Sequence, residues 1–143
     1  MSRALAALSA VGVLVFVAAG CGGSGSGAGG SSAIYTAKAT LPCLREKGFT
    51  HVTTAARKVG LIASVAEHGG LRATAKSGNT VTIAFTAGAN DVGGTERAFR
   101  RFAKGVYKGH IRDVMRAQGN AVLVWTETPS DAELNDALGC LRS

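Results

Sequence analysis

The chain has 143 residues, a formal net charge of +7, and charged side chains at 17% of its positions. One folded domain is the natural count for this length, and enzymes built from several large domains are excluded. A domain of this size can bury its own core by only a modest margin, so a covalent cross-link would be a useful stabilising element.

The first 20 residues have the layout of a secretory signal peptide. Arg3 supplies one positive charge, and residues 4–20 are uncharged and largely apolar. We therefore expect residues 1–20 to direct export and to be removed. An ordinary cleaved signal and an uncleaved anchor are the alternatives, since the apolar run is at the lower limit for crossing a bilayer.

The residues around Cys21 indicate which type of signal peptide this is. The segment Val17-Ala18-Ala19-Gly20-Cys21 resembles the lipobox of bacterial lipoproteins, although Ala18 stands where leucine is usual. The resemblance implies that the chain is cut before Cys21 and that this cysteine carries lipid on its sulfur. It also implies that the mature protein is held in the cell membrane, on the extracytoplasmic face.

Residues 21–32 form a candidate tether between this anchor and the domain. After Cys21 the chain reads GGSGSGAGGSS, which contains no charge and no side chain large enough to pack. Such composition is typical of a flexible linker. The glycine run is not a phosphate-binding loop, because no Lys-Ser or Lys-Thr follows it at the required spacing.

The other two cysteines, Cys43 and Cys140, form an even pair once Cys21 is assigned to lipid. Disulfides form and persist in exported proteins, so we expect a bridge between the two ends of the domain. The alternative is a pair of buried free thiols. A metal site is not expected, since no C-x-x-C pair or suitably spaced histidine completes a ligand set.

The predicted domain comprises residues 33–143. In its first half the pattern predicts two helices and a hairpin. Thr40 can cap a short helix that has Pro42 in its first turn and ends at Gly48. Apolar residues recur at helical spacing over residues 54–68, although Gly60 interrupts them. Residues 71–76 and 80–86 alternate around the turn Ser77-Gly78-Asn79 and predict a β-hairpin.

The second half predicts a helix over residues 95–106, with Phe99 and Phe102 on its apolar side. Residues 111–116 are interpreted as an edge strand and residues 121–126 as an interior strand of the sheet. Ser130 and Glu133 have capping-box spacing at the start of a closing helix that carries Cys140 near its end.

These elements predict an α+β fold of two layers, with a four-stranded antiparallel sheet and helices packed on one face. The pattern Cys43-Leu44 followed by Gly48, together with Cys140-Leu141, loosely resembles small uncharacterised lipoproteins of actinobacteria. That resemblance supplies no activity.

The sequence contains no G-x-S-x-G, H-E-x-x-H or nucleotide-binding motif. The acidic residues Asp131 and Glu133 are explained by the first turn of the closing helix, where negative charge complements the helix dipole. We therefore expect no metal, no cofactor and no catalytic set. The alternative is an envelope enzyme, or an enzyme accessory subunit, whose site gathers scattered residues such as His51, Asp91, His110 and Asp113.

One basic group suggests a partner. It lies on a single predicted helical segment and comprises Arg97, Arg100, Arg101, Lys104 and Lys108. Such a face could contact anionic lipid headgroups or an acidic envelope polymer, or it could simply be solvated. Nucleic acid is not expected, because few aromatic residues are available for base stacking. The overall expectation is a non-enzymatic binding or structural module of the cell envelope, with a protein partner that the sequence does not identify.

Overall fold

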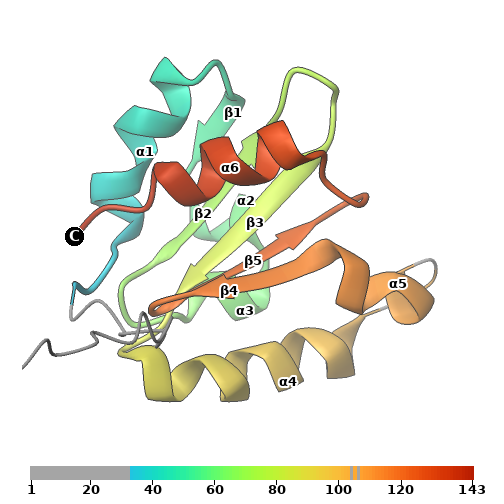
Figure 1. Ribbon diagram of the computed structural model, residues 1–143. Helices are drawn as coiled ribbons and strands as arrows, with labels where there is room; N and C mark the ends of the chain where they lie inside the picture. Colours follow the sequence, from blue (N-terminus) through green and yellow to red (C-terminus); the bar gives the residue numbers. More distant parts are fainter. Residues whose placement is uncertain (1–32, 104, 106) are drawn as a thin grey trace, which may run out of the picture.

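The computed structural model describes residues 33–143 except residues 104 and 106. These residues form one antiparallel sheet of five strands in the order β1-β2-β3-β5-β4, with helices packed against it (Figure 1). The strands are β1 (Thr50–Thr53), β2 (Gly70–Thr74), β3 (Thr80–Phe85), β4 (Met115–Gln118) and β5 (Ala121–Trp125). The helices are α1 (Ala37–Glu46), α2 (Ala56–Val59), α3 (Leu61–Ser64), the 3-10 turn η1 (Ala89–Asp91), α4 (Val92–Phe102), α5 (Tyr107–Val114) and α6 (Asp131–Gly139).

The α+β class is confirmed, whereas the predicted strand count and the packing of helices on one face are wrong. Alternate residues of β3 point to opposite sides of the sheet. Ile83 lies in the main core with Leu44 of α1 and Ala137 of α6. Ala84 packs on the other side against Val59 of α2 and Ala63 of α3. In Figure 1, α6 accordingly crosses in front of the sheet, while α2 and α3 lie behind it.

The fifth strand, β1, is short and irregular. It pairs with β2 through Thr50 opposite Thr74 and Thr53 opposite Arg72, and the register shifts between these two pairs. His51 lies in this interval with φ of 50°, a left-handed backbone that is uncommon outside glycine. The edge strand is therefore too distorted to show the alternation by which β-strands are predicted.

Glycine explains the failure of the predicted helix over residues 54–68. Gly60 has φ of 82° and ψ of 160°, which ends α2 and begins α3 in a new direction. Ten residues further on, Gly70 lets β2 approach α3 closely. A Cβ built on Gly70 would lie 2.4 Å from the Ala63 carbonyl oxygen, so only glycine fits between this helix and the sheet.

One other helix and one strand also differ from the prediction. Helix α1 begins at Ala37, because the Thr36 side chain accepts a hydrogen bond from the Ala39 N–H. Thr40 is buried inside the helix instead of capping it, and Pro42 lies in the helix interior. Residues 107–114 form helix α5, so the strand expected over residues 111–116 begins only at Met115.

Local signals in the rest of the chain are confirmed. The hairpin joins β2 to β3 in continuous register from Gly70 opposite Ala84 to Thr74 opposite Thr80. Ser130 and Glu133 form the reciprocal capping box of α6. Strand β5 lies inside the sheet between β3 and β4, as its hydrophobicity predicts.

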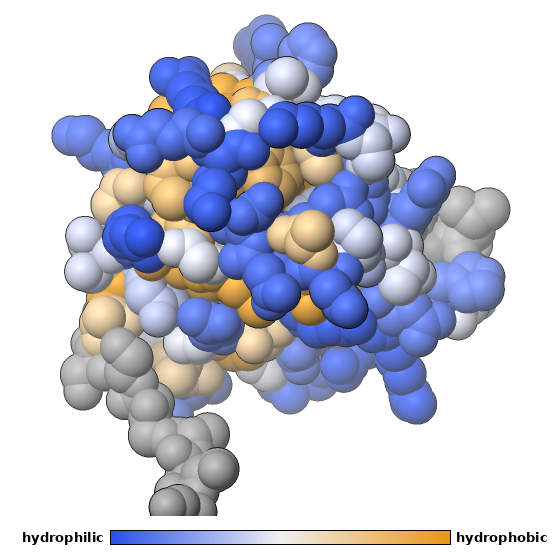
Figure 2. Space-filling view, turned by 45° about the horizontal axis from the view of Figure 1, so that its top comes forward, coloured by the Kyte–Doolittle hydropathy of each residue, from blue (hydrophilic) through white to orange (hydrophobic). Residues whose placement is uncertain are grey.

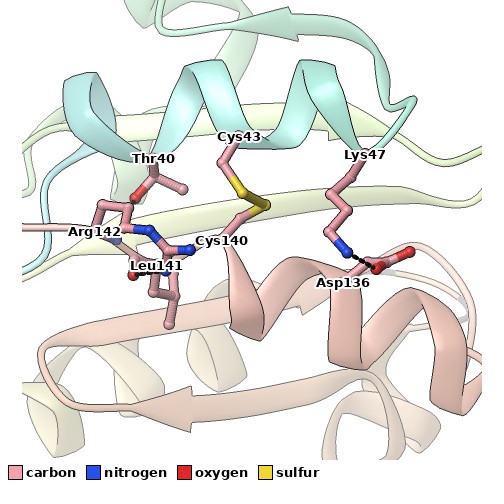
Figure 3. Close-up of a disulfide and its surroundings, with 7 residues drawn as sticks. All are labelled: Thr40, Cys43, Lys47, Asp136, Cys140, Leu141 and Arg142. Atoms are coloured by element: carbon pink, nitrogen blue, oxygen red, sulfur yellow. Dashed lines mark hydrogen bonds and ion pairs between the residues drawn. A yellow bond between two sulfur atoms is a disulfide. The ribbon is translucent and has the colours of Figure 1, made fainter.

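A disulfide joins α1 to the end of α6 and so links the two ends of the domain (Figure 3). The Cα atoms of Cys43 and Cys140 are 5.4 Å apart. Nearby, the Arg142 N–H donates to Thr40 Oγ1 at 3.2 Å, and Lys47 forms an ion pair with Asp136 at 3.0 Å. On the side of the molecule seen in Figure 2, hydrophobic residues show mainly in gaps between hydrophilic ones.

Candidate functional site

The predicted lipid attachment lies outside the described residues. This applies to Cys21, to the signal segment of residues 1–20 and to the tether of residues 21–32. Within the part of the chain that is described, no helix has the length and apolar character needed to cross a bilayer. The structure does contain the disulfide between Cys43 and Cys140 that was expected from the cysteine count.

The basic group does not lie on one helix. Helix α4 ends at Phe102, because Ala103 has extended backbone angles. Arg97, Arg100 and Arg101 are exposed on α4, while Lys108 is exposed on α5. Lys104 lies outside the described residues. Arg100 also forms an i,i+4 ion pair with Glu96 at 3.4 Å, which reduces its availability for another partner.

The scattered residues considered for catalysis do not assemble into a catalytic set. His110 Nδ1 and Asp113 Oδ2 are 3.8 Å apart on α5, beyond hydrogen-bond distance, and both side chains are well exposed. His51 lies on β1 and Asp91 at the 3-10 turn η1. Among the described residues, no group of three or more histidine, cysteine, aspartate or glutamate side chains could hold a metal ion.

The structure instead places an open cleft of about 580 Å³ over the second face of the sheet. We call it the sheet cleft. It lies over β3 and β5, between α2 and α3 on one side and the C-terminal part of α4 on the other. Its volume falls within the range of about 300 to 1,000 Å³ that is usual for small-molecule sites.

The floor of the sheet cleft comes from neighbouring strands. Thr82 of β3 lies opposite Val124 of β5 in the sheet register, and both line the cleft. Thr80 Oγ1 is 3.2 Å from Thr74 Oγ1, and Thr126 Oγ1 donates to Asn79 Oδ1 at 2.8 Å. Because the hydroxyls of Thr80 and Thr126 already have partners, these two groups offer a ligand little unmet hydrogen-bonding capacity.

The walls and rim are apolar. Val59, Ile62, Phe99 and Ile111 line the walls from four different helices. At the rim, Leu61 is 73% exposed and Phe102 is 59% exposed. Phe102 was predicted to lie on the apolar side of its helix, but it is the last residue of α4 and is largely exposed.

Three cations complete the lining: Arg57 and Lys58 of α2, and Arg72 of β2. Arg72 Nη1 donates to the Lys58 carbonyl oxygen at 3.3 Å, which holds strand and helix together at this wall. Among the described lining residues there is no aspartate, glutamate, histidine or cysteine. The described lining residues therefore suit an apolar or negatively charged molecule, and they include no carboxylate or imidazole that could act as a general base and no thiol nucleophile.

Sequence reasoning did not locate this cleft. The alternation over residues 80–86 places Thr80 and Thr82 on the face opposite the main core, but nothing in the pattern indicates that helices cover this face. The one available signal was Thr82 on a strand whose opposite face is fully apolar.

Comparisons with known proteins add no relative: no family model matches the chain, and neither the curated proteins nor the solved structures contain a match.

Proposed function

We propose that the chain is a membrane-anchored extracytoplasmic lipoprotein whose domain is a non-enzymatic binding module of the cell envelope. In this proposal residues 1–20 are removed, Cys21 carries the lipid, and residues 21–32 tether the domain to the membrane. The sheet cleft is the binding site.

The observation that carries the anchoring is the use of the cysteines. The disulfide takes up Cys43 and Cys140 and leaves Cys21, which directly follows the apolar leader, as the odd cysteine. A free thiol at that place in an exported protein needs an explanation, and lipid attachment supplies one. The disulfide itself is the kind of bond that persists outside the cytoplasm.

The chemistry of the cleft lining supports binding over catalysis. Its polar members are threonines and cations, and the hydroxyls of Thr80 and Thr126 are already hydrogen-bonded. In the same proposal, the exposed cations of α4 contact anionic headgroups or an acidic envelope polymer, and they include Arg97 and Arg101. Contact of this kind would hold the tethered domain close to its membrane.

Mass spectrometry of the chain isolated from its own membranes tests the proposal. We expect a mature N-terminus at Cys21 with the mass of attached acyl groups. The Cys21→Ala variant should keep residues 1–20 or lose its acylation. A wild-type chain that begins at any other residue, or that lacks acyl groups, would contradict the proposal. Hydrolytic or transferase activity that depends on His110 and Asp113 would favour the enzyme alternative.

A further inference from the structure

We propose that the sheet cleft binds an anionic single-chain lipid, with the acyl chain over the strands and the head group at the cations. This deepens the proposed function and rests on it, because the anchor would keep the cleft beside a membrane that supplies such lipids. Three features of the described residues carry the inference: the apolar interior, the exposed apolar rim and the one-sided charge.

The interior suits an alkyl chain. Val59, Ile62, Phe99 and Val124 line it from two sides and the floor. The hydroxyls of Thr80 and Thr126 already form hydrogen bonds within the protein. An alkyl chain that covers them would therefore leave neither hydroxyl without a partner. A polar ligand of the same size would gain few hydrogen bonds from these two hydroxyls, whereas an apolar ligand would be removed from water.

The rim is the second feature. Leu61 and Phe102 lie on opposite sides of the cleft, on α3 and at the end of α4, and both are largely exposed. Exposed apolar side chains at the edge of a concave apolar site are typical of a ligand-binding groove. An acyl chain lying between these two residues would cover surface that now faces water.

Charge is the third feature and selects the head group. Arg57, Lys58 and Arg72 contribute positive charge to the cleft, and no carboxylate lies among its described lining residues. Arg72 donates a hydrogen bond to the Lys58 carbonyl oxygen, which places its guanidinium beside α2 at this wall. A phosphate or carboxylate head group complements this arrangement, while a zwitterionic head group brings its own cation into repulsion.

Native mass spectrometry of the full chain in a nonionic detergent tests this inference. The probes are palmitoyl lysophosphatidylglycerol and palmitoyl lysophosphatidylcholine, which share one acyl chain and differ in head-group charge. We expect a non-covalent adduct with a preference of about fivefold or more for the anionic probe, the effect of roughly one basic contact. Arg57→Gln with Arg72→Gln should remove the preference, whereas Arg97→Gln with Arg101→Gln should leave it.

The acyl part has its own matched pair. Leu61→Ser should weaken binding of both probes about tenfold, since the contact of a large apolar side chain is lost. Val65→Ser is the control, because Val65 is 74% exposed, close to the value for Leu61, but does not line the cleft. Thr82→Trp should fill the floor and abolish both adducts. If that variant fails to fold, Phe102→Ser removes the second exposed apolar side chain of the rim and should weaken both adducts as Leu61→Ser does.

The outcomes separate this inference from the proposed function. Acylated Cys21 without a probe adduct, or with adducts that Leu61→Ser and Val65→Ser affect equally, would overturn the lipid site alone. An adduct that shows no head-group preference would overturn the anionic ligand. A chain that binds the anionic probe in the cleft but carries no acyl group on Cys21 would overturn the anchoring alone.

Discussion

The side chain of Asn120 pairs with the backbone of Tyr35 as a neighbouring strand would. Asn120 Oδ1 accepts from the Tyr35 N–H at 2.8 Å, and Nδ2 donates to the Tyr35 carbonyl oxygen at 3.0 Å. The same amide donates to the Thr86 carbonyl oxygen at 2.7 Å. One buried side chain in the β4–β5 turn thus holds the first described segment and the end of the hairpin in place.

Replacing this residue should be costly. Asn120→Ala removes three hydrogen bonds and leaves backbone groups unpaired, so we expect a loss of about 2 to 4 kcal/mol in the free energy of unfolding. Trp125, the single tryptophan, is buried, and its fluorescence in a urea titration measures this change. Asn135→Ala, at an exposed position of α6, is the control and should not lower stability. Equal effects of the two substitutions would contradict the role given to Asn120.

Gly70→Ala tests the close packing of α3 on β2. The new methyl group would overlap the Ala63 carbonyl oxygen, so helix or strand must shift, and we expect a loss of about 2 to 3 kcal/mol. Gly139→Ala is the control, because a Cβ there meets no atom within 4 Å and alanine favours the helix. In a urea titration the midpoint of Gly70→Ala should therefore fall below that of wild type, while the midpoint of Gly139→Ala should not. A Gly70→Ala midpoint equal to wild type would show that the contact is not tight.

The disulfide should be a major source of stability. It closes a loop with a sequence separation of 97 residues, which on the chain-entropy model corresponds to about 4 to 5 kcal/mol. We expect the Cys43→Ser, Cys140→Ser double variant to unfold at much lower urea concentration than the oxidised protein. Adding a reductant should lower the wild-type midpoint toward that of the variant and leave the variant unchanged. A wild-type midpoint insensitive to a reductant that fully breaks the bond would refute this account.

Glu133 should make stability depend on pH in the acid range. The Ser77 hydroxyl and then the Ser130 N–H donate to its carboxylate, and these bonds lower the pKa of Glu133 below the ordinary value of 4.5. Its contribution is complete above about pH 4.5 and is lost as the pH falls through the lowered pKa. Glu133→Gln should thus reduce stability at neutral pH, and its difference from wild type should shrink in acid.

The measurement for Glu133 is the urea midpoint at neutral pH and again well below the pKa. Glu46→Gln, at an exposed position of α1, removes the same charge and should leave the wild-type acid dependence in place. If both variants show identical acid dependence, the bonds to Ser77 and Ser130 do not set it.

The basic face of α4 gives a prediction about membranes. Arg97→Glu with Arg101→Glu should weaken binding of residues 33–143 to phosphatidylglycerol vesicles by about tenfold or more, given roughly 1 kcal/mol for each basic contact. Lys38→Glu with Lys76→Glu changes the net charge equally at exposed positions on other elements and should have the smaller effect. Sedimentation at low and high salt measures both; equal losses would mean that only net charge matters.

Short-range features of this domain could be predicted from sequence. The capping box of Ser130 and Glu133 depends on a spacing of three residues, and the hairpin turn at Gly78 depends on neighbouring residues. Strand β1 could not be predicted, because it is stabilised by pairing with β2 and carries a left-handed residue, His51, in its middle.

The sheet cleft was beyond sequence reasoning for a related reason. Its floor, walls and cations come from strands and helices between Arg57 and Thr126, and only the tertiary fold brings these together. The direction of α3, set by the backbone of Gly60, decides whether Leu61 faces the core or the rim. Periodicity assumes a continuous helix and therefore assigned this stretch incorrectly.

The bond between Cys43 and Cys140 also bears on how the protein withstands proteases. All loops between α1 and α6 lie between Cys43 and Cys140 in the sequence, so they belong to the closed loop of chain that this disulfide forms. A protease that cuts any one of these loops opens the closed loop without releasing a fragment, so both pieces stay joined and can remain folded. A chain nicked in this way would keep the rest of its domain attached to the segment that precedes Cys43.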